Sequence, residues 1–134
     1  MPGGQLTESV GPVGLHTEIE RIFSVGGDGA ADCAKAAADA GAQAVGANCG
    51  EVDPFEVAQI VAIMRRATDL PLLAEPNAGK PKLVGERTVF DMSPEAFAQG
   101  VVECGRAGAQ LLGGCCGTTP AHLRAAVEAI QTMR

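Results

Sequence analysis

Two adjacent cysteines near the carboxyl end of the chain are the residues best suited to chemistry. They are Cys115 and Cys116, in the stretch GGCCGTTP from Gly113 to Pro120. Neighbouring residues on a regular strand point to opposite faces, so two adjacent thiols can act together only where the backbone bends. The surrounding glycines permit such a bend. The pair therefore indicates a built site, either a metal centre or a redox-active vicinal disulfide.

A third cysteine, Cys49, is related to this pair by an internal repeat. DAGAQAVGANCG (39–50) and RAGAQLLGGCCG (106–117) are identical at seven of twelve positions, and the alignment puts Cys49 opposite Cys116. The AGAQ half is a common helix-to-strand connection. The inference that the two cysteine-bearing segments are related therefore depends on the glycine–cysteine half. The other two cysteines, Cys33 and Cys104, fall inside predicted helices, where a small buried apolar role is expected.

Composition narrows the class of protein. The chain has 134 residues, 46% of them hydrophobic, and a net charge of -6, which suits one globular acidic domain. No basic stripe is present, so nucleic acid and anionic membranes are not expected partners. The apolar runs are too short to span a bilayer, and the first residues lack the features of a signal peptide. We therefore expect a cytoplasmic protein, in which five cysteines, an odd number, favour metal binding or catalysis over disulfides.

The elements that must position these cysteines are apolar strands alternating with amphipathic helices. Such alternation is typical of an α/β fold with a parallel sheet covered by helices. Residues 1–18 are rich in Gly and Pro and are interpreted as a loose leader, which leaves 19–134 as the domain. NAGKPKLVGERTVFDM (77–92) is expected to be a long loop. The predicted strands are 19–27, 42–49, 70–76 and 109–114, and the helices start near Asp28, Asp53, Ser93 and Thr119.

Caps and apolar faces support the helix predictions. Asp28 is expected to cap the first helix, and Asp53, followed by Pro54 and Glu56, has the pattern of a capping box. His122, in the first turn of the last helix, is expected at the surface. The apolar faces expected to point inward are Val57, Ile60, Val61 and Met64; Phe97, Val101 and Cys104; and Leu123, Ala126, Val127 and Ile130.

This arrangement predicts that three thiols converge. Cys49 and the Cys115–Cys116 pair end alternate strands, with one strand between them, at the face where parallel α/β folds keep their sites. Thiolate ligands select zinc over magnesium or calcium, and three protein ligands leave the fourth position of a tetrahedral site open. Asn48 directly precedes Cys49, and Asn77 falls in the loop after the middle predicted strand. Each could bind a substrate or orient a cysteine, or could serve only as a turn residue.

Three motifs together resemble one family. GANCG (46–50), PNAG (76–79) and GGCCGT (113–118) look like the homocysteine S-methyltransferase family, which includes the homocysteine domain of cobalamin-dependent methionine synthase and betaine–homocysteine methyltransferase. The resemblance runs from about residue 39 to 130. It implies a (β/α)8 TIM barrel in which Cys49, Cys115 and Cys116 bind Zn2+. The fourth position on the metal would take the sulfur of homocysteine, which is methylated to give methionine.

The chain departs from that family in length. A complete barrel needs about 250 residues, whereas four strand–helix units correspond to the C-terminal half. The N-terminal DG motif and the acidic groups that hold the amino end of homocysteine have no match here. Three explanations compete: a split enzyme completed by another subunit, a homo-oligomer that closes one barrel, and a truncated remnant. The methyl donor is not specified, and a corrinoid would have to reside on a separate protein.

Two classes of function follow. The first is a zinc-dependent methyltransferase, or a subunit of one, that activates homocysteine. The alternative is a non-catalytic zinc-binding half-barrel that acts as a scaffold or regulatory partner, with the fourth metal position closed. A weaker third interpretation is a redox protein that uses Cys115 and Cys116.

Overall fold

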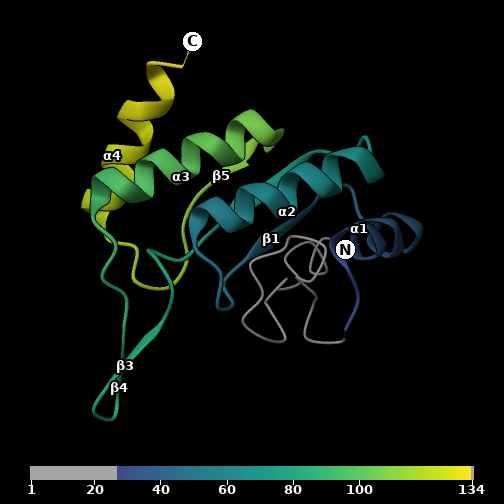
Figure 1. The fold of residues 1–134 in the computed structure, drawn as a ribbon. Helices are drawn as coiled ribbons and strands as arrows, with labels where there is room; N and C mark the ends of the chain where they lie inside the picture. Colours follow the sequence, from purple (N-terminus) through teal and green to yellow (C-terminus); the bar gives the residue numbers. More distant parts are fainter. Residues whose placement is uncertain (1–26, 134) are drawn as a thin grey trace.

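A computed structural model describes residues 27–133 of the chain, in which helices pack on one face of a three-stranded parallel sheet (Figure 1). The sheet order is β1-β2-β5, with every pair parallel. The expected α/β architecture is therefore confirmed for this part, whereas the predicted leader 1–18 and nearly all of the predicted strand 19–27 lie outside the described residues. The elements are α1 (Ala30–Asp39), β1 (Val45–Asn48), α2 (Pro54–Ala67), β2 (Leu72–Glu75), β3 (Lys82–Val84), β4 (Arg87–Val89), α3 (Pro94–Ala107), β5 (Leu111–Leu112) and α4 (Pro120–Gln131).

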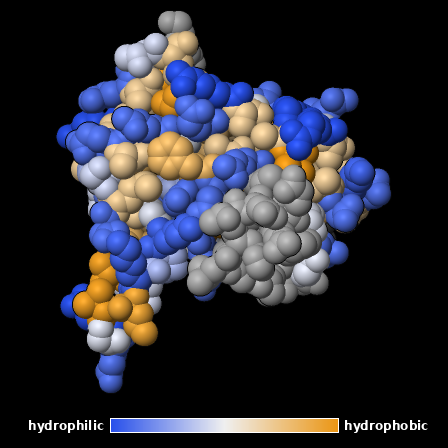
Figure 2. All heavy atoms as spheres, in the orientation of Figure 1, coloured by the Kyte–Doolittle hydropathy of each residue, from blue (hydrophilic) through white to orange (hydrophobic). Residues whose placement is uncertain are grey.

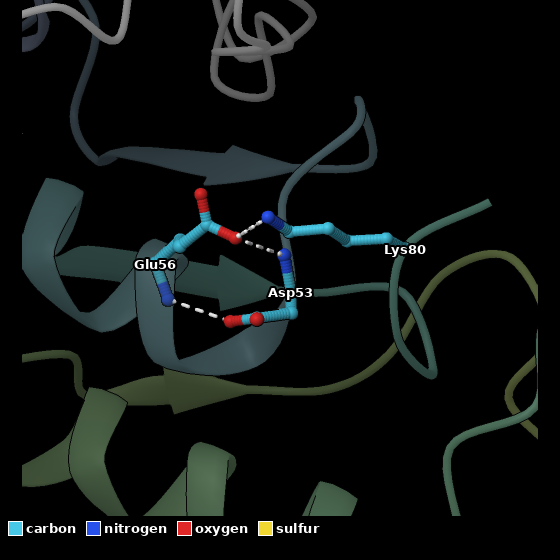
Figure 3. A network of polar contacts seen from close by, with 3 residues as sticks. All are labelled: Asp53, Glu56 and Lys80. Atoms are coloured by element: carbon cyan, nitrogen blue, oxygen red, sulfur yellow. Dashed lines mark hydrogen bonds and ion pairs between the residues drawn. The ribbon is translucent and has the colours of Figure 1, made fainter. Parts of the chain in front are cut away.

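Side-chain caps set the starts of three helices. At α2 the Asp53 carboxylate accepts a hydrogen bond from the Glu56 backbone N–H at 2.9 Å, and Glu56 accepts one from the Asp53 N–H at 3.4 Å. Lys80 adds an ion pair to Glu56 at 2.8 Å (Figure 3). Ser93 caps α3 and Thr119 caps α4, as predicted. The prediction for α1 was wrong by one residue, because its N-cap is Gly29, which has no side chain to accept a bond.

The main core lies between the sheet and α1, α2 and α3. Alternate strand residues Val45, Ala47, Leu72 and Ala74 are buried against the helices. Successive strand residues point to opposite faces, so this alternation puts one face of each strand on the helices. The predicted faces of α2 and α3 are confirmed: the buried residues are Val57, Ile60, Val61 and Met64 in α2 and Phe97, Val101 and Cys104 in α3.

The predicted inner face of α4 is largely wrong. Ala126 is buried, but Leu123 and Val127 are exposed and Ile130 is only partly buried. The reason is position: α4 follows the edge strand and packs mainly on α3. Its apolar side therefore lacks the neighbouring element that a longer sheet would supply.

The sheet face opposite the helices is only partly covered in residues 27–133. Leu73 pairs in register with Gly46 on one side and Leu111 on the other. Leu73 is half-buried, and Leu111 is 51% exposed. In a closed barrel this face would line the interior. The described part of the chain thus presents an apolar surface that a larger assembly could cover.

The expected loop 77–92 contains a β-hairpin that projects from the body of the molecule (Figure 1). β3 and β4 pair antiparallel with Val84 opposite Arg87, so Gly85 and Glu86 form a two-residue turn. Gly85 has φ +63, a value that two-residue hairpin turns require and that glycine adopts readily. The loop prediction overlooked this turn signal between short runs containing Val84 and Val89. Apolar side chains gather on the hairpin (Figure 2), where Leu83 and Val84 are exposed.

Among residues 27–133, no helix combines the length and apolar character that crossing a bilayer requires. The cytoplasmic location stays a prediction.

Candidate metal centre

Three cysteine sulfurs meet at the carboxyl edge of the sheet. Cys49 follows β1 directly, and Cys115 and Cys116 lie in the loop after β5. Because β2 lies between these strands, the two cysteine loops approach each other across its end, as the sequence predicted. The three Sγ atoms lie within 4.8 Å of one another, and those of Cys49 and Cys116 are 3.8 Å apart.

This spacing fits a zinc ion. With Zn–S bonds of about 2.3 Å, the sulfur–sulfur edge of a tetrahedral site is about 3.8 Å. The Cys49 and Cys116 sulfurs already have this separation. The Cys115 sulfur lies no more than 4.8 Å from either of them, so it would have to move about 1 Å or less to reach the same separation. Cys49 and Cys115 are half-buried and Cys116 is exposed, so a small ligand could approach the cluster from solvent.

Unusual backbone conformations direct the sulfurs toward one another. Cys49 has φ +55 and, among the described residues, is the one non-glycine residue with positive φ. This conformation is uncommon for a side chain other than Asn, Asp or Gly and is typical of functional sites. After the second loop, Gly117 has φ +76, and a Cβ there would lie 2.3 Å from the Phe90 Cβ. The repeat that aligned Cys49–Gly50 with Cys116–Gly117 therefore also marks two left-handed turns, since Gly50 has φ +74.

The chain just beyond β2 supports the Cys115–Cys116 loop through its backbone. Cys115 donates its N–H to the carbonyl of Pro76 at 2.9 Å, and Ala78 donates its N–H to the carbonyl of Cys116 at 2.9 Å. On the other side, the Cys49 N–H donates to the Glu75 carbonyl at 3.4 Å. Segment 75–78 thus lies between the two cysteine loops and bonds to both.

The two asparagines singled out from the sequence differ in their surroundings. Asn77 is 1% exposed; its Nδ2 donates to the Gly50 carbonyl at 2.8 Å, and its Oδ1 accepts from the Cys116 N–H at 3.0 Å. Its side chain therefore contacts both cysteine loops. Asn48 is half-buried and pairs in register with Glu75, on the sheet face opposite the helices. Of the two, Asn48 is the one placed on the open face.

Burial changes the acidity of two thiols. It is the main reason that the pKa of Cys115 rises to about 11, with the adjacent Cys49 and Cys116 adding to the increase. Burial also raises the pKa of Cys104 to about 12. Cys104 donates a hydrogen bond to the Pro54 carbonyl at 3.4 Å and takes no part in the cluster. Without a bound cation, the Cys115 thiol therefore stays protonated at neutral pH.

His122 corrects one prediction. It was expected at the surface, but it is 8% exposed and contacts the Phe97 ring edge-on, with ring centroids 5.4 Å apart. Its Nδ1 faces the Thr119 hydroxyl at 2.7 Å, and its Nε2 lies 2.7 Å from the Met92 carbonyl. His122 occupies the third helical position of a capping box that usually holds Glu or Gln. The sequence indicates that residue 122 stands at the capping position of this helix. It does not indicate that a histidine there would cap the helix or would bond to the chain that follows the hairpin.

Comparison with known proteins connects the chain to one family. The family profile described as Homocysteine S-methyltransferase matches residues 12–130. The match begins well before the three motifs and includes residues 12–38, which the motifs alone did not connect to the family.

Curated relatives are much longer than this chain. Methionine synthase of Mycobacterium tuberculosis is 32% identical over 95 residues, which cover 70% of this chain and 8% of that protein. Methionine synthase of Mycobacterium leprae is 29% identical over 121 residues, covering 89% of this chain and 10% of that protein. The chain therefore spans a tenth or less of each of these relatives.

Solved structures of one Escherichia coli enzyme share the fold. The metallated form of the homocysteine methyltransferase MmuM matches with a TM-score of 0.59 at 26% identity, over 82% of this chain and 32% of that one. The oxidized form matches with a TM-score of 0.58 at 28% identity, over 84% of this chain and 33% of that one. The similarity therefore involves about a third of the MmuM chain.

Proposed function

Because the chain belongs to the homocysteine S-methyltransferase family, we propose that it binds Zn2+ through Cys49, Cys115 and Cys116 and activates the thiol of homocysteine for methylation to methionine. The observation that carries this proposal is the approach of the three sulfurs to within 4.8 Å of one another. The metallated MmuM structure, similar in fold and sequence, is consistent with a metal at the cysteine edge.

The chemistry of the donor set suits this role. When bound, zinc would supply the positive charge that deprotonates a coordinated thiol at neutral pH. Three anionic sulfur ligands would keep a fourth sulfur electron-rich, which favours attack on a methyl group. The chain's own residues hold the sulfurs in place and leave Cys116 accessible. Asn48, on the open sheet face, is proposed to contact the rest of the substrate.

The remaining part of the active site would come from outside the described residues. The chain matches about a third of MmuM, and the apolar sheet face around Leu73 and Leu111 is only partly covered. We propose that a second copy of the chain or a separate subunit completes the barrel. The methyl donor would then approach the cysteine cluster from the mouth of the barrel, at the carboxyl edge of the strands. A corrinoid donor would be carried by another protein. A cytoplasmic location suits free thiols.

The decisive experiment is the metal content of the chain, purified in the absence of chelators under reducing conditions. We expect about one zinc per chain, as for a three-cysteine site with one open position. Cys115→Ser should lose the metal, and Cys104→Ala, which removes a buried cysteine outside the cluster, should retain it. Absence of zinc in the wild type, even after zinc is supplied, would contradict the proposal.

A second step separates catalysis from scaffolding. Homocysteine added to the cobalt-substituted protein should change the visible spectrum, because its sulfur enters the open position. Metal binding without any response to homocysteine would instead favour the non-catalytic zinc-binding module.

A further inference from the structure

Glu75 is the last residue of β2, the middle strand, and its side chain lies on the open face of the sheet. Ala74 is buried against the helices, whereas Leu73 and Glu75 are half-buried on the other side of the strand. Asn48 pairs with Glu75 in register, and the next residue along the chain is Cys49. Because side chains alternate along a strand, Glu75 is directed into the interior of any barrel that this sheet forms.

The segment after β5 leaves room for the Glu75 side chain. Gly113 follows β5 directly, and its N–H donates to the Ala74 carbonyl at 2.9 Å, which places it beside Glu75. A Cβ at Gly113 would lie 3.3 Å from the Glu75 Cγ and 3.8 Å from its Cδ. The Glu75 side chain therefore leans toward the segment that leads to Cys115, over a position where the chain has no side chain.

The Glu75 carboxylate has no cationic partner within residues 27–133. The two lysines of the following loop are engaged elsewhere, because Lys80 pairs with Glu56 and Lys82 pairs with Asp91, each at 2.8 Å. A partly buried carboxylate is costly unless a cation or a hydrogen-bond donor replaces the lost water. Three thiolates on a divalent metal ion would add further negative charge nearby. A cation beside Glu75 would therefore be favoured.

We propose that Glu75 binds the ammonium group of the thiol substrate and so selects thiols that carry an amino group. The proposal rests on the proposed function for its substrate, homocysteine, in which a short carbon chain joins the sulfur to an ammonium group. With the sulfur at the cluster, that chain can extend along the open sheet face toward Glu75. Hydrogen bonds between an ammonium and a carboxylate are stronger than those between neutral groups. Glu75 is not one of the three cluster residues, so its role is separate from holding the metal.

The first measurement compares two thiols on the cobalt-substituted chain. L-homocysteine and 4-mercaptobutyrate differ in the amino group, and the visible spectrum gives a dissociation constant for each. The wild type is expected to bind homocysteine about tenfold more tightly or better, and Glu75→Gln, which keeps the shape but removes the charge, should abolish most of this preference. Comparing the ratio of the two constants between variants cancels differences in thiol acidity.

Two further variants make the comparison specific. Glu51→Gln is the matched control, because it removes the same charge from an exposed position in the loop after Cys49. It should leave the ratio unchanged, which separates a local contact from the general charge of the site. Glu75→Asp keeps the charge on a shorter side chain and should restore part of the preference. It also serves as the test variant if Glu75→Gln does not fold.

The second measurement needs no metal. In the metal-free chain, L-methionine should shift the amide NMR signal of Gly113, whereas 4-(methylthio)butyrate, which lacks the amino group, should not. Glu75→Gln should remove the shift, and Glu51→Gln should retain it. This experiment tests the ammonium site even where no thiol can coordinate.

The outcomes separate the two proposals. If the wild type binds cobalt and homocysteine, an unchanged ratio in folded Glu75→Gln overturns the role of Glu75 and leaves the proposed function intact. If the wild type binds no metal or gives no response to homocysteine, the proposed function fails and the NMR titration decides. A methionine shift that depends on Glu75 then supports the ammonium site, and the absence of an amine-selective shift overturns it.

Discussion

The sulfurs of Cys49 and Cys116 lie 3.8 Å apart, although the two strands that lead to them are separated by β2. Alternate strands of a flat parallel sheet are about 9.5 Å apart. The gap is therefore closed by the loops, through the left-handed turns at Cys49–Gly50 and at Gly117. The site depends on backbone geometry as much as on the presence of thiols.

The first prediction concerns the left-handed conformation of Cys49, with φ +55. In the metal-free protein, Cys49→Gly should be more stable than Cys49→Ala by about 1 kcal/mol, because only glycine adopts positive φ without steric cost. Both variants lack the sulfur, so the comparison isolates the backbone. Urea unfolding of the two variants measures the difference. Equal midpoints would show that the turn imposes no strain on a side chain.

A second prediction concerns the contact between Gly117 and Phe90. Gly117→Ala should weaken metal binding at least tenfold, because a Cβ 2.3 Å from the Phe90 Cβ must displace the loop beside Cys116. Gly41→Ala is the matched control, since Gly41 also has positive φ, +98, but a Cβ there meets nothing within 4 Å. The control should lose stability and retain the metal site. Equal metal affinities in the two variants would contradict the prediction.

The third prediction concerns the start of α2. Asp53→Ala should lower the free energy of unfolding by about 1 kcal/mol, because it removes the side-chain half of the capping box. Lys80→Met should cost less, under about 1 kcal/mol, since the Lys80 end of the Lys80–Glu56 pair is exposed to solvent and screened by salt. The hydrogen bond to Glu56 raises the pKa of Lys80, so the ion pair contributes below the usual lysine pKa and is lost above the raised one. Urea unfolding at low and high salt distinguishes the two effects.

Cys104 provides a test at alkaline pH. Burial raises its pKa from 9.0 to about 12, so the folded chain keeps this thiol protonated where the unfolded chain has lost the proton. Its contribution to stability is therefore complete below pH 9 and decreases between pH 9 and 12, by about 1.4 kcal/mol per pH unit. The stability difference between the wild type and Cys104→Ala should shrink by this amount as the pH rises. A pH-independent difference would contradict burial of the thiol.

Association is the fifth prediction. Leu111 is 51% exposed on the open sheet face, and we expect the mass from light scattering to exceed that of one chain. Leu111→Glu should return the mass toward that of one chain. Leu83→Glu, an equal change on the projecting hairpin, should not. A wild-type mass equal to one chain would refute association through the sheet.

The sequence by itself determined the strand–helix alternation, the caps at Asp53, Ser93 and Thr119, and the three cysteines at one edge. These features depend on local periodicity, on hydrogen bonds between residues three apart, and on the rule that parallel strands end at the same edge. Family membership followed from the motifs, because they combine rare residues in a fixed order.

Only the tertiary structure decided how the cysteines meet. The positive φ of Cys49, the two bonds of Asn77 and the burial of His122 all depend on neighbours far away in sequence. The exposure of Leu123 and Val127 in α4 likewise depends on which elements are present to cover them. The amphipathic pattern of a helix specifies an apolar face but not which element will pack against it. Likewise, a residue's type does not specify which distant backbone group will lie within hydrogen-bonding distance.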